Sequence, residues 1–388
     1  MVSKIISDKV RLMRRSAIHE MTRLSKELDD VVSLSWAKPL ANTPHHIRDY
    51  AAKKVIEGMT DGYSSSYGLD ELRDAIVKKL LKINNIETKS SGIIVTVGAI
   101  EGIATSLLTI LNPGDEVILP SPTYSTHVSQ VLLASGKPVF APLIEEKGFA
   151  IDFDSIEKAI SKRTKAIIFC SPNNPTGTVF SEEELRRLSE IALRHDLMVI
   201  TDEAYEYFTF DEHKHFSMAS IQKMRKNVIS CFTLTKTYAM TGWRIGYLCA
   251  DEEIVTQISK SHIPFTICAP VASQYAALAA MTGPQDCIDE FRSKYKSARD
   301  LMCSRLDNLK HVFEYQRPYG SYLMFPKILL REGSNSEKFC KKLLYDAKVS
   351  STPGGDFGPT GEGHLRLSFC VPEDMINIAF DRMDGYFK

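Results

Sequence analysis

The chain of 388 residues carries 48 basic and 48 acidic side chains, so its formal net charge is zero, and 44% of its residues are hydrophobic. This length predicts two or three domains with cores large enough to fold without disulfide or metal staples. The balanced charge argues against a nucleic-acid partner, although a local basic pocket for one small anion remains compatible with it. Since no apolar run reaches the ~18–20 residues that a membrane helix needs, no membrane partner is expected.

The first fifteen residues interrupt their apolar positions with Ser, Lys, Asp and Arg, and they lack the apolar core of a secretory signal. They are predicted instead to form an amphipathic helix. The eight cysteines are irregularly spaced, contain no C-x-x-C pair, and lie in several cases within apolar runs. This pattern favours buried, reduced thiols in a cytoplasmic protein, with a cysteine nucleophile or a metal site as the less favoured alternative.

From residue 92 onward, short apolar segments alternate with segments of helical periodicity. Strands are expected over residues 93–97, 117–120, 137–143, 165–170, 197–201, 227–232 and 245–250. Helices are expected over residues 100–111, 124–134, 151–160 and 182–195, the last of them opened by a capping box of Ser181 and Glu184. This alternation predicts an α/β fold with a mostly parallel, mixed central sheet that helices cover on both faces.

After about residue 280 the pattern changes to a long charged helix over 286–309, the segment YLMFPKI, a helix over 338–347 and the segment HLRLSFC. These elements predict a smaller α+β domain that packs with the N-terminal segment. We therefore expect the chain to divide into an N-terminal arm of the small domain (1–45), a large domain (46–280) and a small C-terminal domain (281–388).

Ligands of parallel sheets bind at the carboxyl ends of the strands, so polar residues directly after strands are the candidates for function. Gly98, Ala99 and Ile100 follow one strand and open a helix, whose free N–H groups would cradle a phosphate. A glycine required only by the turn is the alternative. Residues 171–177, SPNNPTG, follow another strand as a stiff loop that would hold Asn174 in place, with a candidate cis X-Pro bond. An ordinary turn is the alternative there.

Asp202 and Tyr205 follow the strand over 197–201. A carboxylate at the end of a buried strand needs a partner. One possible partner is a metal ion, but no cluster of His or Asp with ligand spacing accompanies this carboxylate. The other is a protonated heterocyclic nitrogen.

Thr233, Thr235 and Lys236 follow the strand over 227–232, and Arg244 lies shortly downstream. A partly buried lysine loses its charge readily, which suits Schiff-base chemistry; a solvated lysine and a helix-end arginine are the alternative. A phosphate cradle, a rigid asparagine, a strand-end aspartate and a hydroxyl-flanked lysine together describe a site for a phosphorylated, cationic aromatic aldehyde held as an imine.

These motifs resemble those of the class I/II aminotransferases, which are fold-type I pyridoxal-phosphate enzymes related to aspartate aminotransferase. The resemblance extends from about residue 30 to 385 and rests on SPNNPTG, TDEAY, TLTKTYAMTGWRIGY, HLRLSF, DGYSSSYGLDELRDAI and PSPTYSTH. It implies pyridoxal 5′-phosphate as the cofactor. It also implies that the enzyme moves an amino group between an L-amino acid and a 2-oxo acid by a ping-pong mechanism through a Schiff base on Lys236.

The resemblance assigns the cofactor contacts residue by residue. Lys236 would carry the Schiff base and move the substrate proton, and Asp202 would pair with the pyridinium nitrogen. Tyr205 and Asn174 would bind the phenolic oxygen, and Tyr124 would stack on the ring. The groups expected around the phosphate are the Ala99 and Ile100 amides, the Thr233 and Thr235 hydroxyls, and Arg244. The cationic ring and Arg244 are expected to lower the pKa of Lys236.

The resemblance also assigns the substrate contacts and the assembly. Arg366 would hold the substrate α-carboxylate in a two-donor fork, beside Asn174 and the Ala37 amide. Tyr63 would reach the phosphate of a neighbouring subunit, which implies a homodimer with shared active sites; a surface or core tyrosine is the alternative. Residues 35–38, SWAK, depart from the family's G-x-G-x-P turn, so Trp36 and Lys38 would narrow or charge the pocket.

Other interpretations differ in how far the residues support them. A C–S β-lyase or an aminocyclopropane-carboxylate-synthase-like eliminase would use the same cofactor and nearly the same site. An idle regulatory protein is disfavoured by the intact Lys236, Asp202 and Arg366. A nicotinamide-dependent dehydrogenase is disfavoured because no G-x-G-x-x-G follows the first strand. No pattern assigns the substrate side chain, for which the residues considered are Arg15, His19, His127 and His262.

Overall fold

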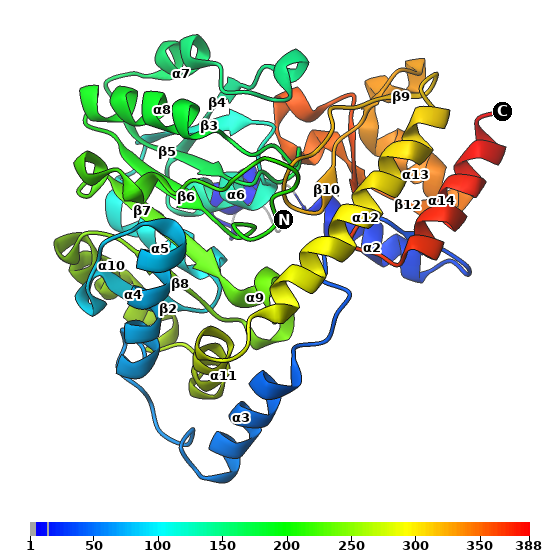
Figure 1. Cartoon of the computed structure of the whole chain (residues 1–388). Coiled ribbons are helices and arrows are strands. Elements are labelled where there is room, and N and C mark those ends of the chain that lie inside the picture. Colours follow the sequence, from blue (N-terminus) through cyan, green and yellow to red (C-terminus); the bar gives the residue numbers. More distant parts are fainter. Residues whose placement is uncertain (1–4, 14) are drawn as a thin grey trace.

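A computed structural model describes residues 5–13 and 15–388 of the chain, and Figure 1 shows its elements. Within these residues, seven strands form a central sheet in the order β2 (Ile93–Thr96), β8 (Gly246–Cys249), β7 (Val228–Thr233), β6 (Met198–Asp202), β5 (Thr164–Cys170), β3 (Glu116–Ser121) and β4 (Lys137–Pro142). Strand β8 is antiparallel to both of its neighbours, and the remaining pairs are parallel. The predicted mixed sheet is confirmed.

The strands are apolar at successive positions because helices cover both faces of the sheet. In β5, Ile167 packs into the cluster on one face and Ile168 into the cluster on the other. Val199 and Ile200 divide in the same way in β6. Successive side chains of a strand point to opposite faces, so a strand buried on both sides has no polar alternation.

The helices that follow the strands lie close to where the sequence predicts them. They are α5 (Ala99–Ile110), α6 (Ser125–Leu133), α7 (Phe153–Ala159) and α8 (Glu182–Arg194). The capping box is confirmed, because the Ser181 hydroxyl accepts from the Glu184 N–H and the Glu184 carboxylate accepts from the Ser181 N–H. No prediction covered α3 (His45–Ile56), α4 (Asp70–Asn84), α10 (Glu252–Thr266) or α11 (Val271–Thr282), of which α11 packs against α3 and α4.

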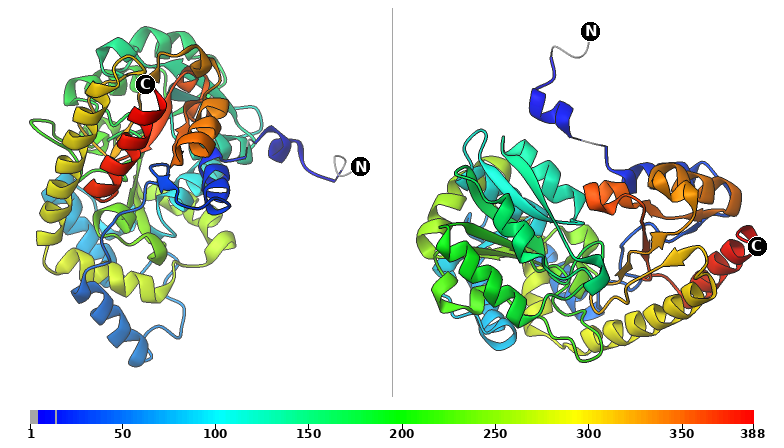
Figure 2. Two further views of the ribbon diagram at one scale, coloured as in Figure 1. Left: turned by 90° about the vertical axis from the view of Figure 1, so that its right-hand side faces the viewer. Right: turned by 90° about the horizontal axis from the view of Figure 1, so that it is seen from above.

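A second group of elements lies beside the central sheet, and α12 (Asp286–Asn308) leads from one to the other (Figure 2). The group contains a small antiparallel sheet, two strand pairs and three helices. The sheet has the order β10 (Leu323–Met324), β14 (Leu365–Ser368) and β13 (Thr352–Pro353). The pairs are β1 (Val32–Ser33) with β12 (Val349–Ser350) and β9 (Phe313–Glu314) with β11 (Lys327–Ile328). The helices are α2 (Ala17–Lys26), α13 (Ser336–Ala347) and α14 (Glu373–Tyr386).

The N-terminal helix is shorter than predicted. Among the first fifteen residues, those described form a helix only over Asp8–Leu12 (α1), while residues 1–4 and 14 lie outside the description. Helix α1 contacts α6, but none of its side chains is buried, so little apolar packing stabilises a longer helix. The N-terminal helix that contributes to a hydrophobic core is α2, whose Met21 and Leu24 join the core of the second group.

Cysteine burial agrees with the sequence pattern. All eight cysteines are free thiols, and all except the half-buried Cys287 are buried. Of the helices in the described residues, none has both the length and the apolar composition needed to cross a membrane.

Candidate active site

A cavity of about 730 Å³ lies where the carboxyl ends of β5, β6 and β7 meet β14 of the small sheet. Twelve of the thirteen predicted site residues line it: Ala37, Ala99, Ile100, Tyr124, Asn174, Asp202, Tyr205, Thr233, Thr235, Lys236, Arg244 and Arg366. The thirteenth, Tyr63, does not line the cavity and is 81% exposed on the surface of the single chain. Strand ends thus bring together residues that are far apart in the sequence.

One end of the cavity is built to hold an anion. Gly98 precedes α5 with φ +79°, and a Cβ placed there would lie only 2.9 Å from Arg244 Nη2. The glycine therefore lets the guanidinium approach the start of the helix. The first-turn amides, including those of Ala99 and Ile100, have no acceptor within the helix, and the helix dipole makes this end positive.

Two hydroxyls line the same end of the cavity. The oxygens of Thr233 and Thr235 lie 2.8 Å apart, and the Thr233 hydroxyl caps the short helix α9 (Leu234–Thr237) by accepting from the Thr235 N–H. Helix-start amides, hydroxyl groups and a guanidinium are together the donor set that suits a phosphate.

Asp202 ends β6 and is almost fully buried. Its Oδ1 accepts from the Ala204 N–H at 3.2 Å, and its Oδ2 lies 3.1 Å from Nε2 of His127. This partner, His127 on α6, was not foreseen from the sequence: it is one of the four residues considered for the substrate side chain, and it does not line the cavity. The sequence did contain an indication that His127 lies near the site, because it follows Tyr124 by three residues, within one helical turn. In the structure the two rings meet edge to face at 5.4 Å.

Lys236 points its amine toward the segment that replaces the family's glycine-rich turn. Its Nζ donates to the Ala37 carbonyl at 2.8 Å. The pKa of Lys236 is lowered to about 8, mainly by burial and to a smaller extent by the charges of Arg366 and Arg244, against the opposing effects of Cys370 and Asp202. Arg244 contributes to the lowered pKa of Lys236, as expected from the sequence, but removal from water has a larger effect than either arginine.

Arg366 on β14 is buried on the opposite side of the cavity. Its Nη1 donates to Asn174 Oδ1 at 3.1 Å, and its Nη2 donates to the Ser35 carbonyl at 2.7 Å. Its Nε has no partner in the described part of the chain. Burial lowers the pKa of this guanidinium. A buried cation held by neutral oxygens retains a strong attraction for an anion that enters the cavity.

The remaining wall consists of two tyrosines and the SPNNPTG loop. Burial raises the pKa of Tyr124 and that of Tyr205, so both hydroxyls are protonated and can donate at neutral pH. In the loop, the bonds Ser171–Pro172 and Asn174–Pro175 are both cis, which confirms the candidate cis bond. The loop holds the buried Asn174 beside the guanidinium of Arg366.

The residues that depart from the family's G-x-G-x-P turn form part of the cavity wall. Trp36 and Lys38 both line the cavity, and Trp36 is 45% exposed. The Trp36 ring meets His19 edge to face at 6.1 Å, and His19 also lines the cavity. Of the other residues considered for the substrate side chain, His262 and Arg15 do not line it. Lining residues that the sequence did not single out are Ser16, Ile18, Thr126, Cys170, Ala204, Thr241 and Gly242.

The comparison with protein families is consistent with this geometry. The model of the family described as aminotransferase class I and II matches residues 29–383. The chain belongs to the class I and II aminotransferases. It is therefore an enzyme, a transaminase, and the resemblance inferred from the motifs is confirmed over almost the same range.

Named relatives of this aminotransferase cover nearly its whole length. It is 36% identical over 386 residues to an aspartate aminotransferase of Pyrococcus abyssi, covering 99% of this chain and 98% of the relative. It is 35% identical to aromatic-amino-acid aminotransferase 2 of Thermococcus litoralis, with the same coverage. Its fold matches the crystal structure of an aromatic aminotransferase from Pyrococcus horikoshii OT3 with a TM-score of 0.89 and 34% identity, over 95% of this chain and 98% of that one.

Proposed function

We propose that this aminotransferase binds pyridoxal 5′-phosphate in the cavity between the central sheet and β14, and that it moves an amino group from an L-amino acid to a 2-oxo acid in two half-reactions. The observation that carries the proposal is the convergence of four groups in one cavity of about 730 Å³: a lysine with a pKa of about 8, a buried aspartate, an anion cradle and a buried arginine. Each group matches one part of the cofactor or of an amino acid.

The residues present fit this cofactor. The start of α5, the two threonine hydroxyls and Arg244 would hold its phosphate. Asp202 would face the ring nitrogen, backed by His127 at 3.1 Å. The protonated Tyr205 hydroxyl and Asn174 would bind the phenolic oxygen, and Tyr124 would stack on the ring. When bound, the cofactor supplies an acceptor for the electron pair that remains when the substrate Cα loses its proton.

Lys236 would act as both base and acid in each half-reaction. A pKa of about 8 leaves a usable fraction of neutral amine at neutral pH, so Nζ can take the proton from the substrate Cα and later return it. The environment maintains this balance because burial disfavours the ammonium form while the nearby Cys370 and Asp202 partly favour it.

Arg366 would bind the α-carboxylate that all amino donors and all 2-oxo acid acceptors share. Its Nη1 and Nη2 already donate to neutral oxygens of Asn174 and Ser35, which fix the plane of the guanidinium. The Ala37 amide lies in the same segment as the Ser35 carbonyl and would add a donor to the carboxylate. Fixing the carboxylate orients the substrate Cα toward Lys236.

The proposed assembly is a homodimer in which Tyr63 completes the phosphate site of the second subunit. Tyr63 is 81% exposed, and the nearby Val55, Ile56 and Met59 are also exposed apolar side chains. Exposed apolar side chains within one short segment of sequence support a surface that a partner covers. We also propose a cytoplasmic location, which the eight free thiols support.

The proposed domain division is an arm over 1–45, a large domain over 46–280 and a small domain over 281–388. Packing supports it, because the buried apolar side chains of α2, α13 and α14 join one cluster, whereas those inside the strands of the central sheet, such as Ile167 and Ile168, join two others.

The test is a half-reaction assay. Purified protein titrated with pyridoxal 5′-phosphate should develop a visible absorbance band, and each suitable amino donor should convert it to the pyridoxamine spectrum without an acceptor present. A 2-oxo acid should then restore the original band. A protein that instead releases ammonia and a 2-oxo acid from its substrate continuously, with no need for an acceptor, would be a lyase or eliminase and would contradict the proposal.

A further inference from the structure

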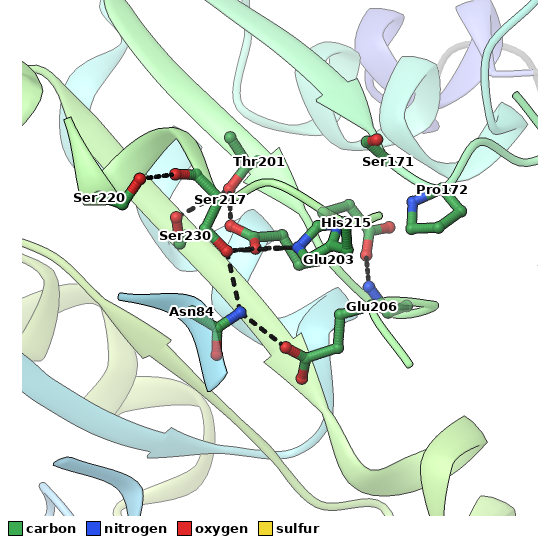
Figure 3. A network of polar contacts seen from close by, with 12 residues as sticks. Asn84, Ser171, Pro172, Thr201, Glu203, Glu206, His215, Ser217, Ser220 and Ser230 are labelled. Atoms are coloured by element: carbon green, nitrogen blue, oxygen red, sulfur yellow. Dashed lines mark hydrogen bonds and ion pairs between the residues drawn. The ribbon is translucent and has the colours of Figure 1, made fainter. Parts of the chain in front are cut away.

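The segment directly after β6 presents side chains in two opposite directions. Asp202 and Tyr205 line the cavity, whereas Glu203 and Glu206 do not. Glu203 is 2% exposed and Glu206 is 8% exposed, and both enter a polar network behind the segment (Figure 3). Two buried carboxylates within four residues are costly, so the way in which they are held requires an explanation.

Glu203 is surrounded by donors on both of its oxygens. His215 Nε2 lies 2.7 Å from Oε2, and the Ser217 hydroxyl donates to the same oxygen. The Thr201 hydroxyl donates to Oε1 at 2.7 Å. Burial by itself raises the pKa of Glu203, but the bonds and charge of His215 and the two hydroxyl bonds outweigh it, so the pKa lies below its usual range. The carboxylate is ionised and fully engaged.

Glu206 is held through α4. Lys79 Nζ lies 2.6 Å from its Oε2, and Asn84 Nδ2 donates to the same oxygen at 2.8 Å. The Asn84 amide also donates to Ser217 Oγ at 2.9 Å, which joins the two carboxylates into one network. The network therefore ties the segment after β6 to the C-terminal end of α4 and to the loop that carries His215.

Backbone hydrogen bonds also fix the turn formed by residues 203–206. The Glu203 N–H donates to the Cys231 carbonyl of β7 at 2.9 Å, and the Glu206 N–H donates to the Glu203 carbonyl at 3.2 Å. Glu203 lies between Asp202 and Tyr205 in this turn, so the side-chain bonds that hold Glu203 also restrain the backbone to which those two residues are attached. Apolar side chains could fill such a pocket at equal or lower free-energy cost, so stability alone does not account for the buried charges.

We propose that Glu203, held by His215 and Ser217, is a positioning residue that fixes the turn between Asp202 and Tyr205 and thereby orients both side chains toward the cofactor. The inference rests on the proposed function, because Asp202 and Tyr205 act only if the cofactor binds in this cavity. Glu203 touches neither cofactor nor substrate in this arrangement and acts through its two neighbours.

The test compares Glu203→Gln with Glu116→Gln in the full-length holoenzyme. Glu116 is a matched control because it is 5% exposed and accepts from a serine hydroxyl, Ser161, at 2.6 Å. It is the first residue of β3, whereas the cavity lies at the carboxyl ends of the central strands. Three quantities are measured: the dissociation constant of pyridoxal 5′-phosphate, the pH midpoint of its visible band, and the melting temperature of the apoprotein. The pH midpoint reports the groups around the ring, so a loss of stability elsewhere does not move it.

In Glu203→Gln we expect the dissociation constant to rise by about tenfold and the pH midpoint to shift. Ser217→Ala, which removes one donor and leaves the carboxylate, should change both quantities in the same direction but less, while Ser161→Ala and Glu116→Gln change neither. Wild-type affinity and pH midpoint in a folded Glu203→Gln protein would overturn the inference. Equal changes in Glu116→Gln would also overturn it.

Two further outcomes are decided by the same set of variants. If Glu203→Gln does not fold, Ser217→Ala decides the matter: a shifted midpoint supports the inference and an unchanged one overturns it. If the wild-type protein itself develops no visible band with pyridoxal 5′-phosphate, the proposed function fails. If the wild-type band forms but its affinity and pH midpoint are unchanged in the Glu203 variant, only the inference about Glu203 fails.

Discussion

The two sides of the cavity are built in different ways. The cofactor side consists of residues at or shortly after the carboxyl ends of central strands, such as Asp202, the last residue of β6, and Lys236, three residues after β7. The substrate side consists of Arg366 on β14 and the segment around Ala37, which are joined by a bond from Arg366 to the Ser35 carbonyl across 331 residues of sequence. The first side depends on local motifs, and the second depends on how two distant segments pack.

This difference separates two kinds of defect. A change on the cofactor side should alter the chromophore and the chemistry for every substrate. A change on the substrate side should leave the chromophore intact and weaken the binding of amino and 2-oxo acids. The following predictions test that separation, and they run from the largest expected effect to the smallest.

Lys236→Ala should remove the visible band of the bound cofactor and reduce turnover by about 10⁴-fold or more, because no other group is expected to move the substrate proton. Absorbance spectra and steady-state assays measure both effects. The assignment is wrong if the variant keeps a band that borohydride fixes onto a different lysine.

Asp202→Ala should reduce turnover by roughly 10²–10³-fold while cofactor still binds. The carboxylate, backed by His127, is expected to keep the ring nitrogen protonated, and a charge-assisted bond is worth about 1.5–3 kcal/mol. The loss of rate should therefore exceed the loss of cofactor affinity, which a titration of apoprotein determines. Wild-type turnover would contradict this role.

Arg366→Lys should raise the Michaelis constant of every amino donor and 2-oxo acid by roughly 10–100-fold, with an unchanged visible band. Lysine keeps the charge but cannot present two parallel donors to a carboxylate. Half-reaction kinetics with acidic, aromatic and aliphatic donors measure the effect. If only acidic donors suffer, Arg366 reads the substrate side chain instead of the α-carboxylate.

Amine labelling of the apoprotein should show Lys236 titrating near pH 8. Because its pKa is lowered to about 8, the protonated form dominates below this pH and the neutral, reactive form above it. The neutral fraction should rise by about tenfold between pH 7 and pH 9, whereas surface lysines titrate near their usual pKa of about 10.4. Quantitative mass spectrometry of the labelled peptides gives the titration curve, and a Lys236 midpoint near 10 would refute the effect of burial.

Gly98→Ala should weaken cofactor binding by about fivefold, because the residue has φ +79° and the added Cβ would lie 2.9 Å from Arg244 Nη2. Gly102→Ala is the matched control within α5, since its Cβ would meet Thr96 at an ordinary 3.5 Å. Cofactor titration compares the two variants. Equal affinities would mean that the approach of Arg244 does not depend on the glycine.

Several features of the fold and of the cofactor side could be predicted from local sequence. The strands are apolar runs bounded by polar turns, and their predicted ends lie within two residues of the observed ends. Parallel strands bring their carboxyl ends to one edge of a sheet, so residues directly after them, such as Asp202 and Lys236, were expected to meet. The capping box at Ser181 was recognisable because its two residues, Ser181 and Glu184, lie three positions apart in the sequence.

Features that join distant segments were not predictable in this way. His127 behind Asp202, the Ser35 carbonyl on Arg366 and the network around Glu203 each depend on side chains that the sequence places far apart. The extent to which burial lowers the pKa of Lys236 belongs to the same class, because burial is a property of the packed chain rather than of neighbouring residues.

By itself, the amino-acid sequence determined the positions of the central strands and of several helices between them, the chemistry available at each strand end and the family to which the chain belongs. Tertiary structure alone decided which buried charge contacts which partner, how far Lys236 is removed from water and which side chains line the entrance of the cavity. The physical reason is range: backbone periodicity and turn preferences act over a few residues, whereas desolvation and buried hydrogen bonds arise only when remote segments pack together.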